Sequence, residues 1–228
     1  MKLYTQTSGD GPDLVLVHGW GLHAGIWERL LPLLEPVFRV TCVDLPGHGR
    51  SSWHNEATLD DLVEAVLPVA PAHADWLGWS LGSLVATRAA LTAPARIGRL
   101  VLLAGTPCFA RRPDWPTAMQ PGLLATFAAD LQQDYAATLN RFLALQVHGS
   151  EHAGAVLREL RACLLEHGEP DSGALAAGLE GPRAMRLANT AAGVVVMEHG
   201  TAICSLSKLR SELPGAPQPA MSAAVVTG

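Results

Sequence analysis

At residues 76–82 the chain reads Trp-Leu-Gly-Trp-Ser-Leu-Gly, which contains the pattern Gly-x-Ser-x-Gly. Apolar residues lead into the pattern, and the helix-forming residues 83–91 follow it. The glycines let an incoming strand and an outgoing helix close on each other, so that Ser80 sits in a strained turn with its hydroxyl exposed. N–H groups at the start of the helix then point toward a developing anion. We interpret the segment as a nucleophile elbow; an ordinary glycine-rich turn is the alternative.

The composition limits the class of protein. The chain has 228 residues, of which 49% are hydrophobic and 16% charged, and its formal net charge is -5 at pH 7. This length suits one α/β domain, with or without a small insertion. The negative balance without any run of Lys or Arg argues against a nucleic-acid partner. We expect no cofactor, and no metal because the nine His show no metal-binding spacing on a helix.

The cysteines and the N-terminus predict a location. The four cysteines lack a Cys-x-x-Cys spacing and are expected to be free thiols in a reducing compartment: Cys42, Cys108, Cys163 and Cys204. Residues 1–10 lack the apolar core of a signal peptide, and no stretch is long and apolar enough to span a bilayer. We therefore expect a cytoplasmic monomer without membrane association.

Apolar runs bounded by turn residues indicate buried strands at residues 14–17, 38–43, 100–104 and at the approach to the elbow. Residues 2–7 suit a short edge strand. Helical spacing covers residues 26–34, and a helix over residues 59–70 follows the N-cap Thr58, with two Asp in its first turn. This alternation predicts a mostly parallel, doubly wound α/β sheet.

The turn His18-Gly19-Trp20-Gly21 follows the first buried strand. Open α/β sheets bind ligands at the carboxyl ends of their strands. The backbone N–H groups of Trp20 and of Leu81, the residue after Ser80, could therefore form a two-donor oxyanion hole. We interpret His18 as a structural histidine that bonds to nearby loops.

Residues 107–178 contain no strand-like run and instead predict helices at residues 123–131, 135–147 and 153–166. An all-helical insertion after a strand would form a lid that supplies the substrate pocket and excludes water. The apolar stripe around Phe142 has two interpretations, packing within the lid or contact with substrate. The predicted organisation is thus an α/β core (1–106), a helical lid (107–178) and a C-terminal segment (179–228), partly disordered.

Four segments together carry a resemblance to a known family: Val17–Gly21, Val43–Ser51, Trp76–Gly82, and Arg-Phe-Leu-Ala-Leu-Gln at 141–146. They resemble the α/β-hydrolase carboxylesterases of biotin synthesis, over about residues 1–180. The resemblance implies a serine esterase that hydrolyses the methyl ester of pimeloyl-[acyl-carrier protein] and releases methanol. The first two segments are common among α/β hydrolases, whereas the last two are more specific.

The resemblance also implies roles for individual residues. Ser80 would be the nucleophile, with Trp20 and Leu81 as oxyanion and substrate contacts. The acyl pocket would be lined by Phe142, Leu143, Ala144, Leu145 and Gln146. A basic surface on the lid would bind the acidic carrier protein. The candidate residues for this surface are Arg111, Arg112, Arg141, Arg158 and Arg161. The alternative is that these arginines form an ordinary solvent-exposed helix face.

The sequence departs from the family after about Glu180. An α/β hydrolase needs an acid and then a histidine after the serine, each following a late strand. Residues 194–197 suit a strand, and His199 is the candidate base; Glu198 cannot easily orient it, because adjacent strand residues point to opposite faces. The expected C-terminal strands are missing or replaced, which suggests a frameshift. The alternatives are therefore a general short-chain ester hydrolase, or a catalytically impaired truncated or frameshifted fragment.

Overall fold

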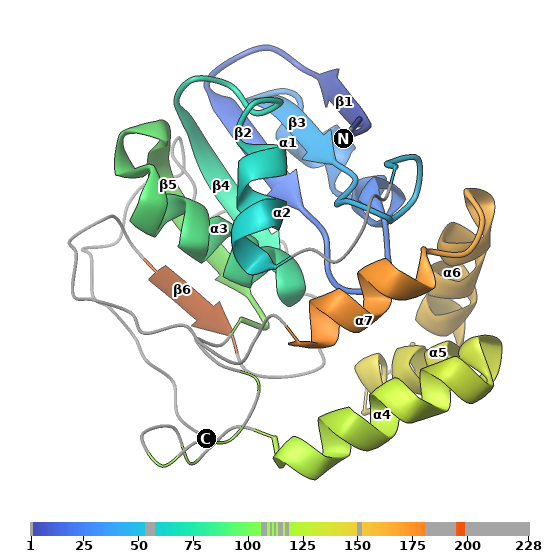
Figure 1. Cartoon of the computed structure of the whole chain (residues 1–228). Helices are drawn as coiled ribbons and strands as arrows, with labels where there is room; N and C mark the ends of the chain where they lie inside the picture. Colours follow the sequence, from blue (N-terminus) through green and yellow to red (C-terminus); the bar gives the residue numbers. More distant parts are fainter. Residues whose placement is uncertain are drawn as a thin grey trace.

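A computed structural model describes residues 2–52, 58–105, 119–149, 152–180 and 195–198, together with residues 109, 111, 113 and 116. The strands form one sheet with the order β1-β3-β2-β4-β5-β6 (Figure 1). Only the β1–β3 pair is antiparallel among these neighbours. The strands are β1 (Thr5–Ser8), β2 (Asp13–Val17), β3 (Arg39–Val43), β4 (Ala74–Trp79), β5 (Ile97–Leu103) and β6 (Val195–Glu198). The predicted mostly parallel sheet is confirmed.

Alternate residues of each central strand enter different cores. Val15 and Val17 of β2 belong to one apolar cluster, whereas Leu14 and Leu16 belong to a second one. This alternation follows from the two-residue period of a strand, and it explains why a strand buried on both faces is continuously apolar. The first cluster includes helices α2 (Leu59–Val66) and α3 (Leu81–Thr92), and the second includes the short helices η1 (Ala24–Trp27) and α1 (Leu31–Leu34).

Local signals fix the starts of the core helices. Thr58 and Asp61 form a capping box at the start of α2, which confirms Thr58 as the predicted N-cap. The helix ends at Val66, and not at residue 70 as was predicted. The predicted helical segment 26–34 is divided into η1 and α1. The division falls before Pro32, which lies in the first turn of α1 and has no N–H to continue a helix from η1. The short helix η2 (Pro94–Arg96) precedes β5.

Four helices lie between β5 and β6 in the chain, and Figure 1 shows α4, α5 and α6 together at the lower right, with α7 between them and α2. They are α4 (Pro121–Gln133), α5 (Tyr135–Gln146), α6 (Ala153–Glu166) and α7 (Ser172–Glu180). The first three were predicted, and we refer to all four as the lid. The boundaries of the predicted units 1–106, 107–178 and 179–228 stay predictions.

Helix α7 was not predicted, and a side-chain cap marks its start. The Asp171 carboxylate accepts hydrogen bonds from the N–H groups of Gly173 (2.8 Å) and Ala174 (3.2 Å). The N–H of Asp171 donates to the carbonyl oxygen of Gly47 at 2.8 Å, so the helix start is bound to the loop after β3. Among the described residues, no helix combines the length and apolarity needed to cross a membrane.

Candidate active site

Ser80 lies between the end of β4 and the start of α3, with φ 53° and ψ -113°. A positive φ is uncommon for a residue with a Cβ, and such strain is concentrated at functional sites. Two backbone hydrogen bonds hold the turn: the Ser80 N–H donates to the Leu103 carbonyl oxygen at 2.9 Å, and the Ser83 N–H donates to the Ser80 carbonyl oxygen at 2.9 Å. The predicted strand, sharp turn and helix around Ser80 are therefore confirmed.

The two glycines of the pattern are required by close backbone approach. A Cβ on Gly78 would overlap the backbone of Gly82, and a Cβ on Gly82 would overlap the carbonyl oxygen of Val17. Strand β4, helix α3 and strand β2 thus meet at a distance that only glycine permits. Ser80 itself remains partly exposed above this contact.

The turn after β2 lies beside the elbow. A Cβ on Gly19 would be 3.4 Å from Cβ of Ser80, so Gly19 and Ser80 are neighbours. Leu81 is the first residue of α3, and its N–H is one of those that a helix start leaves without an intrahelical partner. Trp20 and Leu81 are both buried, at 5% and 3% exposed. The structure thus brings the predicted residues Ser80, Trp20 and Leu81 to one end of the sheet.

Trp20 joins the core to the lid through an aromatic cluster. Its ring centroid lies 5.3 Å from that of Phe127 and 5.4 Å from that of Phe142, and these two phenylalanines are 5.7 Å apart. The indole N–H donates to the carbonyl oxygen of Leu175 in α7 at 2.9 Å. The apolar stripe around Phe142 was predicted to include Phe127, whereas Leu175 was not predicted, because its role depends on the packing of α7.

The predicted pocket residues of α5 point in different directions. Phe142 is half-buried in the aromatic cluster, whereas Leu143 is fully buried in the first core cluster. Ala144 and Leu145 are exposed, and Leu145 is 65% exposed. Gln146 ends the helix, and its side chain lies outside the described part of the structure. A pocket role for this segment remains a proposal, for which Phe142 has the best position.

His18 is a structural histidine in this arrangement, as predicted. The Leu45 N–H donates to its Nε2 at 2.9 Å, and its Nδ1 lies 2.8 Å from the Gly19 carbonyl oxygen, to which it donates as Nδ1–H. Burial, with a further contribution from His48, lowers the pKa of His18 to about 3. Both ring nitrogens are occupied, so His18 binds loops and cannot serve as the base of Ser80.

The carboxyl end of strand β6 lies at the same end of the sheet as the elbow, which follows the carboxyl end of β4. Glu198 lies opposite Leu103 in register, and Leu103 lies opposite Trp79. The strand begins and ends one residue later than predicted, and His199, the candidate base, lies outside the described residues. Within the described residues, the group that could hold a metal ion is His23, Glu166 and His167, which does not include Ser80.

The comparisons with known proteins agree with this geometry. A family model described as alpha/beta hydrolase fold matches residues 12–192. The pimeloyl-[acyl-carrier protein] methyl ester esterase of Nitrosomonas europaea is 46% identical over 179 residues, which cover 78% of this chain and 71% of the relative. The protein of the same name from Methylococcus capsulatus is 46% identical over 180 residues, covering 79% and 70%.

Solved structures share the fold. A hydrolase from Pseudomonas aeruginosa has a TM-score of 0.66 at 29% identity, covering 80% of this chain and 69% of its own. An esterase from Exiguobacterium antarcticum has a TM-score of 0.76 at 18% identity, covering 95% and 85%, and supports the fold alone. Both similarities therefore support the architecture on which the site is built.

Proposed function

Because the chain belongs to the α/β-hydrolase family and, within it, to the pimeloyl-[acyl-carrier protein] methyl ester esterases, we propose that it hydrolyses the methyl ester of pimeloyl-[acyl-carrier protein] through Ser80. The observation that carries the proposal is the strained Ser80 at the start of α3, beside the buried Trp20. No cofactor takes part in the proposed reaction.

The proposed reaction has two steps. Oγ of Ser80 attacks the ester carbonyl carbon, and the resulting oxyanion accepts hydrogen bonds from the N–H groups of Trp20 and Leu81. The tetrahedral intermediate collapses, the carbon–oxygen bond to the methoxy group breaks, and methanol leaves with the proton taken from Ser80. Water then attacks the acyl carbon, the bond from this carbon to Oγ of Ser80 breaks, and one proton of the water returns to Oγ, which leaves the pimeloyl chain with a free carboxyl end.

The pimeloyl group of the substrate would bind in an apolar pocket, and the carrier protein would bind to a charged surface. Trp20, Phe127 and Phe142 offer aromatic faces to the methylene chain of the pimeloyl group. The carrier protein is acidic, and Arg158 and Arg161 are exposed on α6. Arg141 on α5 is also exposed, although it already pairs with Asp130 at 3.2 Å. Arg111 is exposed as well, and Arg112 lies outside the described residues.

The decisive experiment compares two ester classes on the purified full chain. Loss of the methyl group from pimeloyl-[acyl-carrier protein] methyl ester is followed by mass spectrometry, and p-nitrophenyl esters serve as simple substrates. We expect the carrier-bound ester to be preferred and Ser80→Ala to abolish its turnover. Equal efficiency on both classes would indicate a general short-chain esterase. Failure of a fluorophosphonate probe to label Ser80, together with no turnover, would indicate an impaired fragment.

The docking surface has its own test. Replacing Arg158 and Arg161 together by Glu should raise KM for the carrier-bound ester about tenfold, since charge reversal weakens electrostatic encounter. The free methyl ester of pimelic acid lacks the carrier and is the matched control, with unchanged kinetics expected. An equal effect on both substrates would mean that the two arginines do not contact the carrier.

We propose His199 as the general base. It directly follows β6 in the sequence, and β6 ends at the same end of the sheet as the elbow. Removing a general base leaves only the oxyanion hole and binding, so His199→Gln should lower kcat by about a thousandfold or more. The exposed His73 gives a matched control, because His73→Gln should leave kcat unchanged. Equal kcat values in the two variants would exclude His199 as the base.

A further inference from the structure

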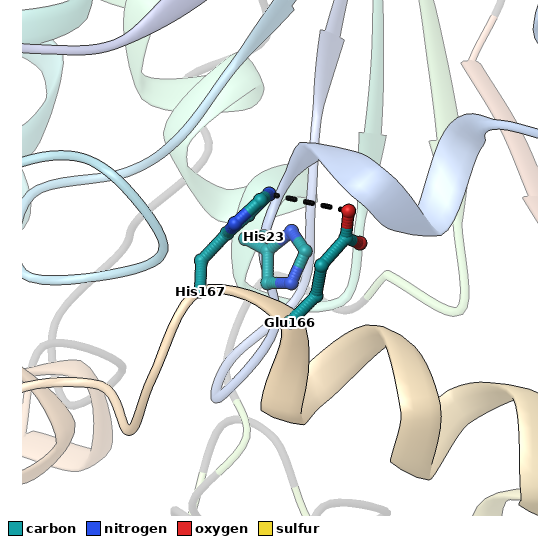
Figure 2. A group of neighbouring side chains, drawn as sticks. All are labelled: His23, Glu166 and His167. Atoms are coloured by element: carbon teal, nitrogen blue, oxygen red, sulfur yellow. Dashed lines mark ion pairs between the residues drawn. The ribbon is translucent and has the colours of Figure 1, made fainter.

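Three side chains with metal-binding donors meet where the lid touches the core. His23 follows the turn after β2 and caps η1, whereas Glu166 and His167 stand at the end of α6. Their donor atoms all lie within 4.8 Å of one another. Figure 2 shows the three side chains converging, with a ring nitrogen of His23 facing the gap between His167 and Glu166. This cluster has no part in the proposed ester hydrolysis.

The hydrogen bonds of His23 fix its tautomer and so determine which nitrogen could bind a metal. Its Nε2 lies 2.5 Å from the carbonyl oxygen of Cys163, which requires a proton on Nε2. Its Nδ1 is therefore unprotonated, and it accepts a bond of 3.1 Å from the N–H of Gly25. Metal-binding histidines commonly hold their second N–H on a backbone carbonyl, which fixes the tautomer and the ring plane. His23 has this arrangement, and an ion bound to Nδ1 would take the place of the hydrogen bond from the Gly25 N–H.

The remaining donors come from Glu166, the last residue of α6, and from His167, which follows it. Nε2 of His167 lies 3.9 Å from Oε1 of Glu166, and the His167 ring centroid lies 4.7 Å from that of His23. Ligands of a tetrahedral ion with bonds of about 2.0–2.2 Å are separated by roughly 3.3–3.6 Å. The Glu166 side chain is 49% exposed, so rotation of its carboxylate can close the difference.

We propose that His23, Glu166 and His167 bind a divalent transition-metal ion of the zinc class, which joins the end of lid helix α6 to the loop after β2. Two imidazole nitrogens and one carboxylate oxygen are a donor set that favours Zn²⁺ over Mg²⁺ or Ca²⁺, which prefer oxygen. Water would complete the coordination, because three protein ligands leave one tetrahedral position open.

The backbone near the cluster is shaped for this packing. A Cβ on Gly25 would lie 2.7 Å from Cε1 and 3.0 Å from Nδ1 of His23, and 3.2 Å from Sγ of Cys163. Any larger residue would displace the His23 ring. Because Trp20 lies in the turn just before His23, a bound ion would restrain the same turn that adjoins Ser80. The ion would act as a link between lid and core.

The test measures metal binding on the full chain, after chelator treatment, and does not depend on esterase activity. Zn²⁺ is titrated by calorimetry, and Co²⁺ is followed by the visible absorption of its four-coordinate form. We expect one equivalent to bind and the Tm to rise by about 5–10 °C when free Zn²⁺ is 100 times its Kd. Absence of saturable binding at one equivalent would overturn the proposal.

Variants distinguish this site from other histidines of the chain. Glu166→Gln and His167→Gln should each weaken Zn²⁺ binding at least tenfold and remove the Tm shift, because each deletes one ligand. The exposed Glu64 and His73 give the matched controls, Glu64→Gln and His73→Gln, which should bind as the parent does. Unchanged affinity in Glu166→Gln and His167→Gln would show that the ion binds elsewhere. His23 is buried and is not needed for the comparison.

Discussion

The indole nitrogen of Trp20 donates a hydrogen bond of 2.9 Å to the carbonyl oxygen of Leu175, which connects the turn after β2 to helix α7. Trp20→Phe removes this donor and leaves the buried carbonyl oxygen without it. We expect the free energy of unfolding to fall by about 1–3 kcal/mol. Urea denaturation of the folded chain measures the change.

Trp27 provides the matched control for that substitution. Its Nε1 is buried and has no hydrogen-bond partner among the described residues. Trp27→Phe therefore removes an unsatisfied donor, and the free energy of unfolding should change much less than in Trp20→Phe, or rise. A larger loss in Trp27→Phe than in Trp20→Phe would contradict the assignment of the Trp20 bond.

Gly82→Ala should prevent formation of the elbow. The added Cβ would overlap the carbonyl oxygen of Val17, and neither α3 nor β2 can move without opening the sheet. We expect a loss of more than about 3 kcal/mol of stability, seen as insoluble protein or a lost thermal transition. A Cβ added to Gly122 in α4 would instead enter open space, so Gly122→Ala should be neutral or stabilising by about 0.5–1 kcal/mol.

Phe142 and Leu145 lie one helical turn apart on α5 and should differ in their effect on substrate. Phe142 packs against Trp20, whereas Leu145 is 65% exposed. We expect Phe142→Ala to lower kcat/KM for the pimeloyl ester by about 10–200-fold, with a smaller loss for an acetyl ester. Leu145→Ala should stay within about twofold for both. The opposite ranking of the two variants would place the acyl pocket elsewhere.

Stability should fall in mild acid because two buried histidines take up protons less readily in the folded chain than in the unfolded chain. Burial lowers the pKa of His18 from 6.5 to about 3 and also lowers the pKa of His48. The unfolded chain takes up these protons near pH 6.5, whereas the folded chain takes them up only at lower pH. Above about pH 7 these histidines are neutral in both the folded and the unfolded chain, so they cause no change of the free energy of unfolding with pH. Below pH 6.5 it falls by on the order of 1 kcal/mol per pH unit because of His18, and His48 contributes in the same direction.

Urea midpoints between pH 7.5 and pH 5 measure this dependence. His18→Asn should reduce the slope, even though it lowers stability at every pH by removing two hydrogen bonds. His73→Gln changes an exposed histidine and should leave the slope as it is. A midpoint that does not change between pH 7 and pH 5 would contradict the neutral state of His18.

The features that could be predicted from the sequence are those that a few neighbouring residues determine. Consecutive apolar residues marked β2, and the glycines around Ser80 marked the elbow, because each requirement lies within a few neighbouring residues. Helix α7 was missed since its small residues show no apolar stripe, and its position depends on Asp171 and on contact with Trp20. The cluster of His23 with Glu166 and His167 joins segments far apart in the chain, so no spacing in the sequence could indicate it.

The order of strands in the sheet has a consequence for synthesis on the ribosome. Strand β2 lies between β3 and β4, so the most buried strand is made before either of its neighbours. Its apolar residues Leu14–Val17 cannot be covered on both edges until residue 79 has emerged. Non-local pairing of this kind folds slowly and leaves apolar surface open to aggregation. The nascent chain is therefore expected to need chaperone protection over its first third.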